Sequence, residues 1–171
     1  MDPTQIISKK ITLLGSHAVG KTSLIAQFVE GKFPESYVTT IGLKVDKKSV
    51  IMESHQLDLL IWDIAGHEDP TKFPAYYLNG CHGYVYVVDL SRPETVKGLK
   101  ERLEQLDKML PNVPRVVVGN KVDLISEADL EKLKKKDGKP LEILASAKTG
   151  LRVNEVFNKL GQKMMEQHES T

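Results

Sequence analysis

The segment from Gly15 to Thr22 has the residue types and the spacing that bind phosphate groups. Its sequence, GSHAVGKT, matches the pattern G-x-x-x-x-G-K-[ST] in full. It lies between the apolar run ITLL and the helix-like run KTSLIAQFV. Backbone N–H groups in such a loop can converge on phosphate oxygens, and the positive end of the helix dipole adds to the attraction. A chance match in an ordinary turn would not account for the strand and the helix on its two sides. The sequence therefore predicts a site for nucleotide phosphates.

Each part of this loop has an expected role. Gly15 and Gly20 let the backbone pass close to the phosphates, and Lys21 neutralises the charge of the β- and γ-phosphates. The Thr22 hydroxyl is expected to ligate a Mg²⁺ ion that bridges these phosphates. The residues expected to hold the phosphates are Gly15, His17, Ala18, Val19, Gly20, Lys21, Thr22 and Ser23.

The stretch WDIAGHE, Trp62 to Glu68, ends an apolar run with a carboxylate and a glycine. A carboxylate at the carboxyl end of a neighbouring strand can hold the same Mg²⁺ ion, usually through water, and Asp63 has this position. Gly66 can offer its N–H group to a terminal phosphate without a side chain in the way. Taken alone, Asp63 could also be a turn residue at the end of a strand.

Two further motifs indicate which base is bound. NKVD follows the apolar run RVVVG, and SAK follows LEILA. The Asp123 carboxylate can accept hydrogen bonds from guanine N1–H and from the guanine 2-amino group, whereas adenine has no donor at either place. Such a mismatch can reject a ligand by a factor on the order of 10⁴ to 10⁵. The Ala147 N–H group can meet guanine O6. The residues expected around the base are Asn120, which would tie this loop to the phosphate loop, Lys121, whose stem would lie along the base, Asp123, Ser146, Ala147 and Lys148.

These motifs need a scaffold that brings the ends of several strands together. Apolar runs of strand length alternate with segments of helical period, which is typical of strand–helix units around a mainly parallel sheet. Gly42 to Met52 alternates polar and apolar residues like an edge strand, and we expect it to pair with Gln56 to Asp63 through a turn near Glu53 to His55. We therefore expect an α/β fold with a mainly parallel six-stranded sheet, one antiparallel edge strand and helices on both faces. The predicted strands are Lys10 to Leu14, Gly42 to Met52, Gln56 to Asp63, Gly83 to Asp89, Arg115 to Gly119 and Leu141 to Ala145.

Three segments show helix signals. Glu94 to Leu110 repeats apolar residues at helical spacing and stops before Pro111, whose ring cannot continue the hydrogen-bond ladder. Ser126 begins the capping box SEAD, which predicts a helix start. The last helix has one apolar stripe, made of Val153, Val156, Phe157, Leu160 and Met164.

The composition limits the classes of protein to which the chain can belong. Its 171 residues, 40% hydrophobic and 27% charged, suit one globular domain spanning residues 1–171. A net charge of +1 provides no basic field for nucleic acid. The single cysteine, Cys81, excludes an intramolecular disulfide, and with His82 it is expected to pack or cap rather than bind zinc. Neither end carries an apolar stretch for a signal peptide or a membrane span, so we expect a cytoplasmic protein without direct membrane insertion.

Five motifs in this order and spacing resemble the Ras superfamily of small GTPases. They are GSHAVGKT, TIG at Thr40 to Gly42, WDIAGHE, NKVD and SAK, and the resemblance runs from about Lys9 to Met165. The stretches ESYVTTIG, WD-x-AG-x-E and YY-x-x-x-x-HGYVYVVD are most similar to the Rab branch. The resemblance implies the P-loop NTPase fold and a monomeric GTPase that binds GTP or GDP with Mg²⁺ and hydrolyses GTP.

The resemblance also assigns roles to residues in the loop before the edge strand. It implies that Thr40 coordinates Mg²⁺ and the γ-phosphate, that Phe33 caps the guanine edge, and that Tyr37 is the switch tyrosine. From the residues alone, Phe33 and Tyr37 flank a proline-containing loop and could pack locally. The implied metal ligands are Thr22, Thr40 and Asp63, and the implied catalytic groups are Lys21, Thr40, Gly66 and His67.

Two histidines depart from the family pattern. The family usually has glutamine at the position of His67, where it orients the attacking water. A neutral imidazole has one donor and one acceptor in a rigid ring, so it cannot copy both ends of the amide. His17 stands where the family has glycine or a small residue, near the place of an inserted arginine finger. We therefore expect slow hydrolysis. Alternatively, His67 takes part in catalysis by orienting water through one nitrogen.

The expected partners act through two switch loops, residues 33–43 and 65–79. The resemblance implies effector, exchange-factor and activating proteins, and it implies an effector patch of Trp62, Tyr77 and Val45. The chain ends MMEQHEST, without the terminal cysteine that prenylation needs. It would reach cytosolic membrane faces through partners or through a lipidated tail missing from this sequence.

Two other functions remain open from the sequence. The first is a GTP-dependent binding module with negligible hydrolysis, whose output is complex formation with an effector. The second is an adenine-nucleotide kinase that uses the same phosphate loop, which NKVD, SAK and the lack of an evident lid segment disfavour.

Overall fold

The computed structural model describes residues 5–66, 69, 72–135 and 140–170. Its centre is a six-stranded sheet with the strand order β2-β3-β1-β4-β5-β6. Only the β2–β3 pair is antiparallel among the described strand pairs, as predicted. The strands are β1 (Gln5–Leu14), β2 (Leu43–Met52), β3 (His55–Ile64), β4 (Gly83–Asp89), β5 (Arg115–Asn120) and β6 (Ile143–Leu144).

The predicted hairpin between the edge strand and its neighbour is confirmed. Met52 pairs with His55, so two residues make the turn, and Glu53 has a positive φ of 53°. Strand ends differ from the prediction mainly in β1, which begins at Gln5, and in β6, which is limited to Ile143–Leu144. The added part of β1 pairs with the start of β3, a long-range contact that the mixed polar and apolar run QIISKK does not indicate.

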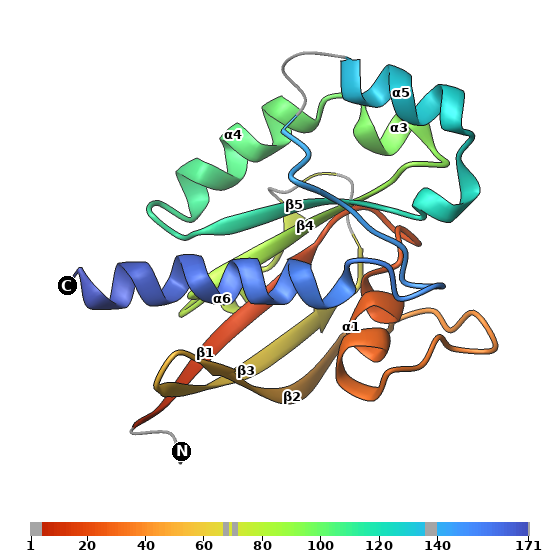
Figure 1. The fold of residues 1–171 in the computed structure, drawn as a ribbon. Coiled ribbons are helices and arrows are strands. Elements are labelled where there is room, and N and C mark those ends of the chain that lie inside the picture. The colour runs from red at the N-terminus through yellow and green to blue at the C-terminus, as the bar shows by residue number, and fades with distance from the viewer. Residues whose placement is uncertain (1–4, 67–68, 70–71, 136–139, 171) are drawn as a thin grey trace.

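Two hydrophobic clusters cover the two faces of the sheet. The first packs α1 (Lys21–Glu30) and α6 (Val153–Glu169) against one face, where the rings of Phe28 and Phe157 stack with centroids 4.0 Å apart. Figure 1 shows α6 running along the sheet with α1 beside it. All five residues of the predicted apolar stripe of α6 are buried. The second cluster packs α2 (Ala75–Leu78) and α4 (Leu99–Met109) against the other face.

The single helix predicted over Glu94 to Leu110 is wrong, because the structure has two helices there. They are α3 (Pro93–Val96) and α4, and they are separated at Lys97 and Gly98. Gly98 has φ 70°, in the left-handed region, so the helical path is interrupted at this residue. The side chain of Thr95 holds α3 to the end of β4 through the backbone of Asp89.

The remaining helix begins as predicted. In α5 (Glu127–Lys135), the Ser126 hydroxyl accepts a hydrogen bond from the Asp129 N–H group at 3.1 Å and contacts its carboxylate at 3.0 Å. None of the helices within the described ranges is both long enough and apolar enough to cross a bilayer. The carboxyl ends of the five mutually parallel strands share one edge of the sheet, and the loops that follow them form the candidate site.

Candidate functional site

A cavity of about 590 Å³ lies at this edge of the sheet. The residues predicted for nucleotide binding that line it are His17, Ala18, Gly20, Lys21, Thr22, Ser23, Phe33, Tyr37, Thr40, Gly66, Asn120, Lys121, Asp123, Ala147 and Lys148. All five motifs, which are far apart in the sequence, thus contribute residues to one cavity. Gly15, Val19, Asp63 and Ser146 are not among the lining residues and act through the hydrogen bonds described below. His67, the predicted catalytic histidine, lies outside the described residues.

The phosphate loop is held by side chains that donate to its carbonyl groups. Lys21 Nζ donates to Gly15 O at 3.1 Å and to Ser16 O at 2.8 Å. Lys121 Nζ donates to Ala18 O at 2.9 Å, and Asn120 Nδ2 donates to Val19 O at 3.0 Å. In a trans peptide bond the N–H group points away from the C=O group. The N–H groups of these peptide bonds in the phosphate loop therefore point away from the Lys21, Asn120 and Lys121 side chains. The predicted tie between Asn120 and the phosphate loop is confirmed.

The surroundings of Lys21 favour the binding of an anion. It is buried, and burial lowers its pKa to about 8, an effect that the nearby Asp63 carboxylate opposes. A buried ammonium group gains from every further negative charge placed beside it. Phosphate oxygens in the cavity would supply that charge, which fits the predicted role of Lys21.

Oxygen atoms suited to Mg²⁺ gather beside Lys21. Thr22 Oγ1 donates to Asp63 Oδ2 at 2.7 Å and lies 2.6 Å from Thr40 Oγ1. Asp63 Oδ1 is buried and has no hydrogen-bond partner among the described residues. Burial also raises the pKa of Asp63, although the hydrogen bond from Thr22 opposes this. A hard cation with oxygen ligands would satisfy the unpaired oxygen and favour the ionised carboxylate, so these residues fit Mg²⁺.

Two glycines allow close backbone contacts at the phosphate end. A Cβ atom on Gly66 would lie 2.7 Å from the backbone N of His17 and 2.7 Å from Lys21 Nζ, closer than real side chains approach. A Cβ atom on Gly20 would clash with Asn120 Nδ2. Gly66 therefore lies directly against the phosphate loop, and its contact with a terminal phosphate stays a prediction.

The base end of the cavity is organised around Asp123. Ser146 Oγ donates to Asp123 Oδ1 at 2.6 Å, which fixes the carboxylate. The Ala147 N–H group donates to Asn120 Oδ1 at 3.1 Å. This N–H group was expected to meet guanine O6, and in this structure it is already engaged. To contact guanine O6, the Ala147 N–H group must either donate to O6 and Asn120 Oδ1 at the same time or give up its bond to Asn120.

Tyr37, in the loop of residues 33–43, contacts the phosphate loop. Tyr37 Oη lies 2.9 Å from His17 Nε2, and the two rings meet edge to face. Tyr37 therefore contacts the phosphate loop across 20 positions of sequence and does not only pack locally. Phe33 lines the cavity and is partly exposed.

Part of the expected effector patch is assembled in the sheet. Val45 pairs with Trp62 across β2 and β3, while Tyr77 packs against the second cluster. Lys10 Nζ lies 3.6 Å from the centroid of the Trp62 ring, a cation–π contact that the sequence did not indicate.

Two residues beside the phosphate loop, Asp89 and Arg92, were not predicted from the sequence. Asp89 ends the apolar run YVYVVD just as Asp63 ends its own strand. The signal that singled out Asp63 could therefore have singled out Asp89. Arg92 lies in no nucleotide motif, and its role depends on contacts that only the fold reveals.

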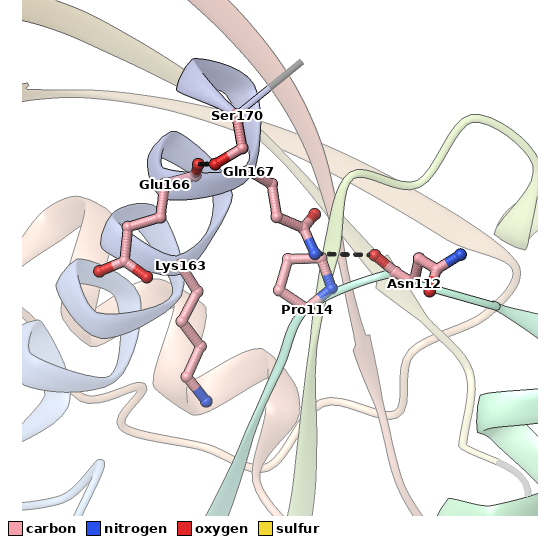
Figure 2. Close-up of a pocket in the computed structure, with 6 residues that line it drawn as sticks. All are labelled: Asn112, Pro114, Lys163, Glu166, Gln167 and Ser170. Atoms are coloured by element: carbon pink, nitrogen blue, oxygen red, sulfur yellow. Dashed lines mark hydrogen bonds between the residues drawn. The ribbon is translucent and has the colours of Figure 1, made fainter.

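A second hollow of about 560 Å³ lies at the other end of the molecule, between the end of α6 and the loop before β5. Figure 2 shows Gln167 bonded to Asn112 across it, with Nε2 donating to the Asn112 carbonyl at 2.9 Å. Lys163, also in its lining, is engaged by Glu142 and by the Arg115 carbonyl. No residue predicted for nucleotide or metal binding lines this hollow. The cavity at the strand ends is therefore the candidate site.

Comparisons with known proteins agree with this geometry. Residues 10–166 match the model of the Ras family. The chain is 32% identical over 156 residues to the Ras-related protein Rab-1C of Dictyostelium discoideum, which covers 88% of this chain and 78% of that protein. The phosphate loop, the Thr22–Thr40–Asp63 cluster and Asp123 adjoin the same cavity. The chain belongs to the Ras family and is a Rab-like small GTPase.

Proposed function

We propose that the chain is a magnesium-dependent GTP/GDP switch whose own hydrolysis of GTP is slow. Family membership implies GTP binding and GTP hydrolysis, and the slow rate is the added element. The observation that carries it is His67, which stands where the family has glutamine. The contact of 2.9 Å between His17 Nε2 and Tyr37 Oη at the edge of the cavity bears on hydrolysis stimulated by a partner. A bulky ring occupies a phosphate-loop position where the family has a small residue, and a switch tyrosine is bonded to that ring.

The groups of the chain would hold GTP in the following way. Lys21 and the loop N–H groups bind the phosphates, and the Thr22, Thr40 and Asp63 oxygens hold Mg²⁺. When bound, Mg²⁺ neutralises charge on the phosphate oxygens. Thr40 and Gly66 come from two different switch loops, so both lose a partner when the γ-phosphate leaves.

Two histidines account for the proposed rates. An arginine finger is worth roughly 10³ to 10⁵ in rate. The family resemblance puts its entry near the phosphate-loop position of His17, whose ring contacts Tyr37. His67 replaces the glutamine that orients water, and an imidazole cannot reproduce both polar ends of that amide. The proposed result is a long-lived GTP state.

Single-turnover hydrolysis of GTP tests this proposal. We expect His67→Gln to hydrolyse GTP faster than the unaltered chain, and His55→Gln, a histidine at the start of β3, to leave the rate unchanged. A slower or unchanged rate in His67→Gln would refute the slow-switch proposal, and a slower rate would favour a catalytic His67. Because His17→Gly removes the ring from the phosphate loop, we expect it to increase stimulation by an added arginine-finger protein.

Effector binding is the proposed output of the switch. The loop of residues 33–43 exposes apolar side chains that a partner could cover, and the most exposed is Ile41 at 91%. Such exposure suits a loop that is recognised by protein partners when the nucleotide orders it. We expect effector, exchange-factor and activating proteins to contact this loop together with residues 65–79.

The alternative, a GTP-dependent binding module with negligible hydrolysis, would use the same surface. Phosphate release measured with and without an activating protein separates the two functions. A chain that releases no phosphate in either case is a binding module only.

A further inference from the structure

A buried carboxylate at the end of β4 gathers two cationic side chains. Asp89 is 1% exposed. Its Oδ2 atom accepts from Arg92 Nε at 3.0 Å and from Lys121 Nζ at 2.7 Å. Its Oδ1 atom accepts from the N–H group and the hydroxyl of Ser91. The carboxylate is thus fully paired and holds both cations in fixed directions.

Each of these cations also donates to the phosphate loop. Arg92 Nη2 donates to His17 O at 2.7 Å, and Lys121 Nζ donates to Ala18 O at 2.9 Å. Two adjacent carbonyl groups of the loop are therefore bound by two cations that share one carboxylate. Lys121 belongs to the NKVD motif, whereas Arg92 belongs to none of the nucleotide motifs.

The shape of the arginine side chain makes this bridge possible. Arg92 bonds Asp89 through Nε and His17 through Nη2 at the same time, in the fixed plane of its guanidinium group. A lysine has a single nitrogen on a flexible stem and cannot reproduce this fork.

We infer that Arg92, oriented by Asp89, is a positioning residue that fixes the phosphate loop at His17 and thereby slows the release of nucleotide. This inference rests on the proposed function. His17 is then held from two sides, its carbonyl by Arg92 and its ring by Tyr37. If the His17 carbonyl lost its bond to Arg92, we expect both the phosphate loop and the contact between His17 and Tyr37 to become more mobile.

Release of a fluorescent GDP analogue, mantGDP, tests the inference in the full chain. We expect Arg92→Gln to release mantGDP roughly tenfold faster, the scale of one charge-assisted hydrogen bond. Arg92→Lys keeps the charge without the fork and should give an intermediate rate. Asp89 keeps its bonds to Lys121 and Ser91 in these variants, so the fold should persist.

Arg115→Gln is the matched control. Arg115 has a side-chain exposure of 30% against 35% for Arg92, and it pairs with Asp107. It lies at the start of β5, whereas Asp89 pairs with the last residue of that strand. We expect Arg115→Gln to leave release unchanged even if it lowers stability.

A ³¹P NMR spectrum of bound GDP adds a readout that stability alone would not move. We expect the phosphate resonances to shift in Arg92→Gln and not in Arg115→Gln. Unchanged release and unchanged resonances in Arg92→Gln would overturn the inference while leaving the nucleotide switch intact. Failure of the unaltered chain to bind mantGDP would instead overturn the proposed function, and the inference with it.

Discussion

Replacing Asp123 with asparagine should change the base that the protein prefers. The carboxylate lines the cavity and is oriented by Ser146, whose hydroxyl donates to one carboxylate oxygen at 2.6 Å. In Asp123→Asn we expect the amide oxygen to take this place, because the Ser146 hydroxyl already accepts from the Thr149 N–H group and has its proton left to donate. The NH₂ group then takes the place of the second oxygen and meets the guanine edge as a donor.

The magnitude follows from the two hydrogen bonds that guanine would make to the carboxylate. Each bond to a charged group contributes about 1.5–3 kcal/mol, so losing both weakens binding by roughly 10² to 10⁴. Xanthine has a carbonyl where guanine has its 2-amino group, so it can accept from the new NH₂ group. The variant should therefore gain affinity for xanthine nucleotides while it loses affinity for guanine nucleotides.

Competition of GDP, XDP and ADP against mantGDP measures this change, with mantXDP as the probe for the variant. Asp129→Asn is a suitable control because Asp129 lies in the first turn of α5, outside the cavity lining, and it should leave base preference unchanged. Equal loss of all nucleotides in Asp123→Asn would refute the reasoning, since it would mean that the carboxylate supports the fold and does not select the base.

Three further outcomes can be measured. Gly66→Ala places a Cβ atom 2.7 Å from the backbone N of His17, so it should weaken GTP binding more than GDP binding in mant-nucleotide titrations; equal weakening would contradict a γ-phosphate role. Phe157→Ala removes a fully buried ring stacked on Phe28 and should lower the free energy of unfolding by about 3–5 kcal/mol in urea titrations. The pKa of Lys21 is lowered to about 8 from 10.5, so above pH 8 the unfolded chain binds a proton that the folded chain lacks, and the nucleotide-free protein should gain stability as pH rises toward 10.5. The gain should be at most about 1.4 kcal/mol per pH unit, and Lys21→Met should abolish it.

Most of the site could be predicted because its chemistry is local in sequence. The phosphate loop and Asp123 come after apolar strands, Asp63 lies near the end of one, and parallel strands bring their carboxyl ends to one edge. Knowing that these motifs follow strands was therefore enough to predict that they meet. The alternation of polar and apolar residues in β2 likewise indicated an edge strand from residue types alone.

The parts that were missed depend on backbone conformation or on distant contacts. The break before α4 arises at Gly98, where apolar spacing continues across the gap and hides it. The bond from Ala147 to Asn120 joins two loops 27 positions apart. Arg92 meets the carbonyl of His17 across 75 positions, and no residue pattern encodes that distance.

The two anchors from the NKVD segment have a consequence for how errors in base choice are detected. Asn120 and Lys121 donate hydrogen bonds to the carbonyl groups of Val19 and Ala18, so a movement of the NKVD segment is coupled to the phosphate loop. A nucleotide with the wrong base that pushes this segment aside also pulls at the phosphate end. A mismatched base would thus also speed release of the phosphates. The protein would then discriminate more strongly between guanine and other bases without any additional contact to the base.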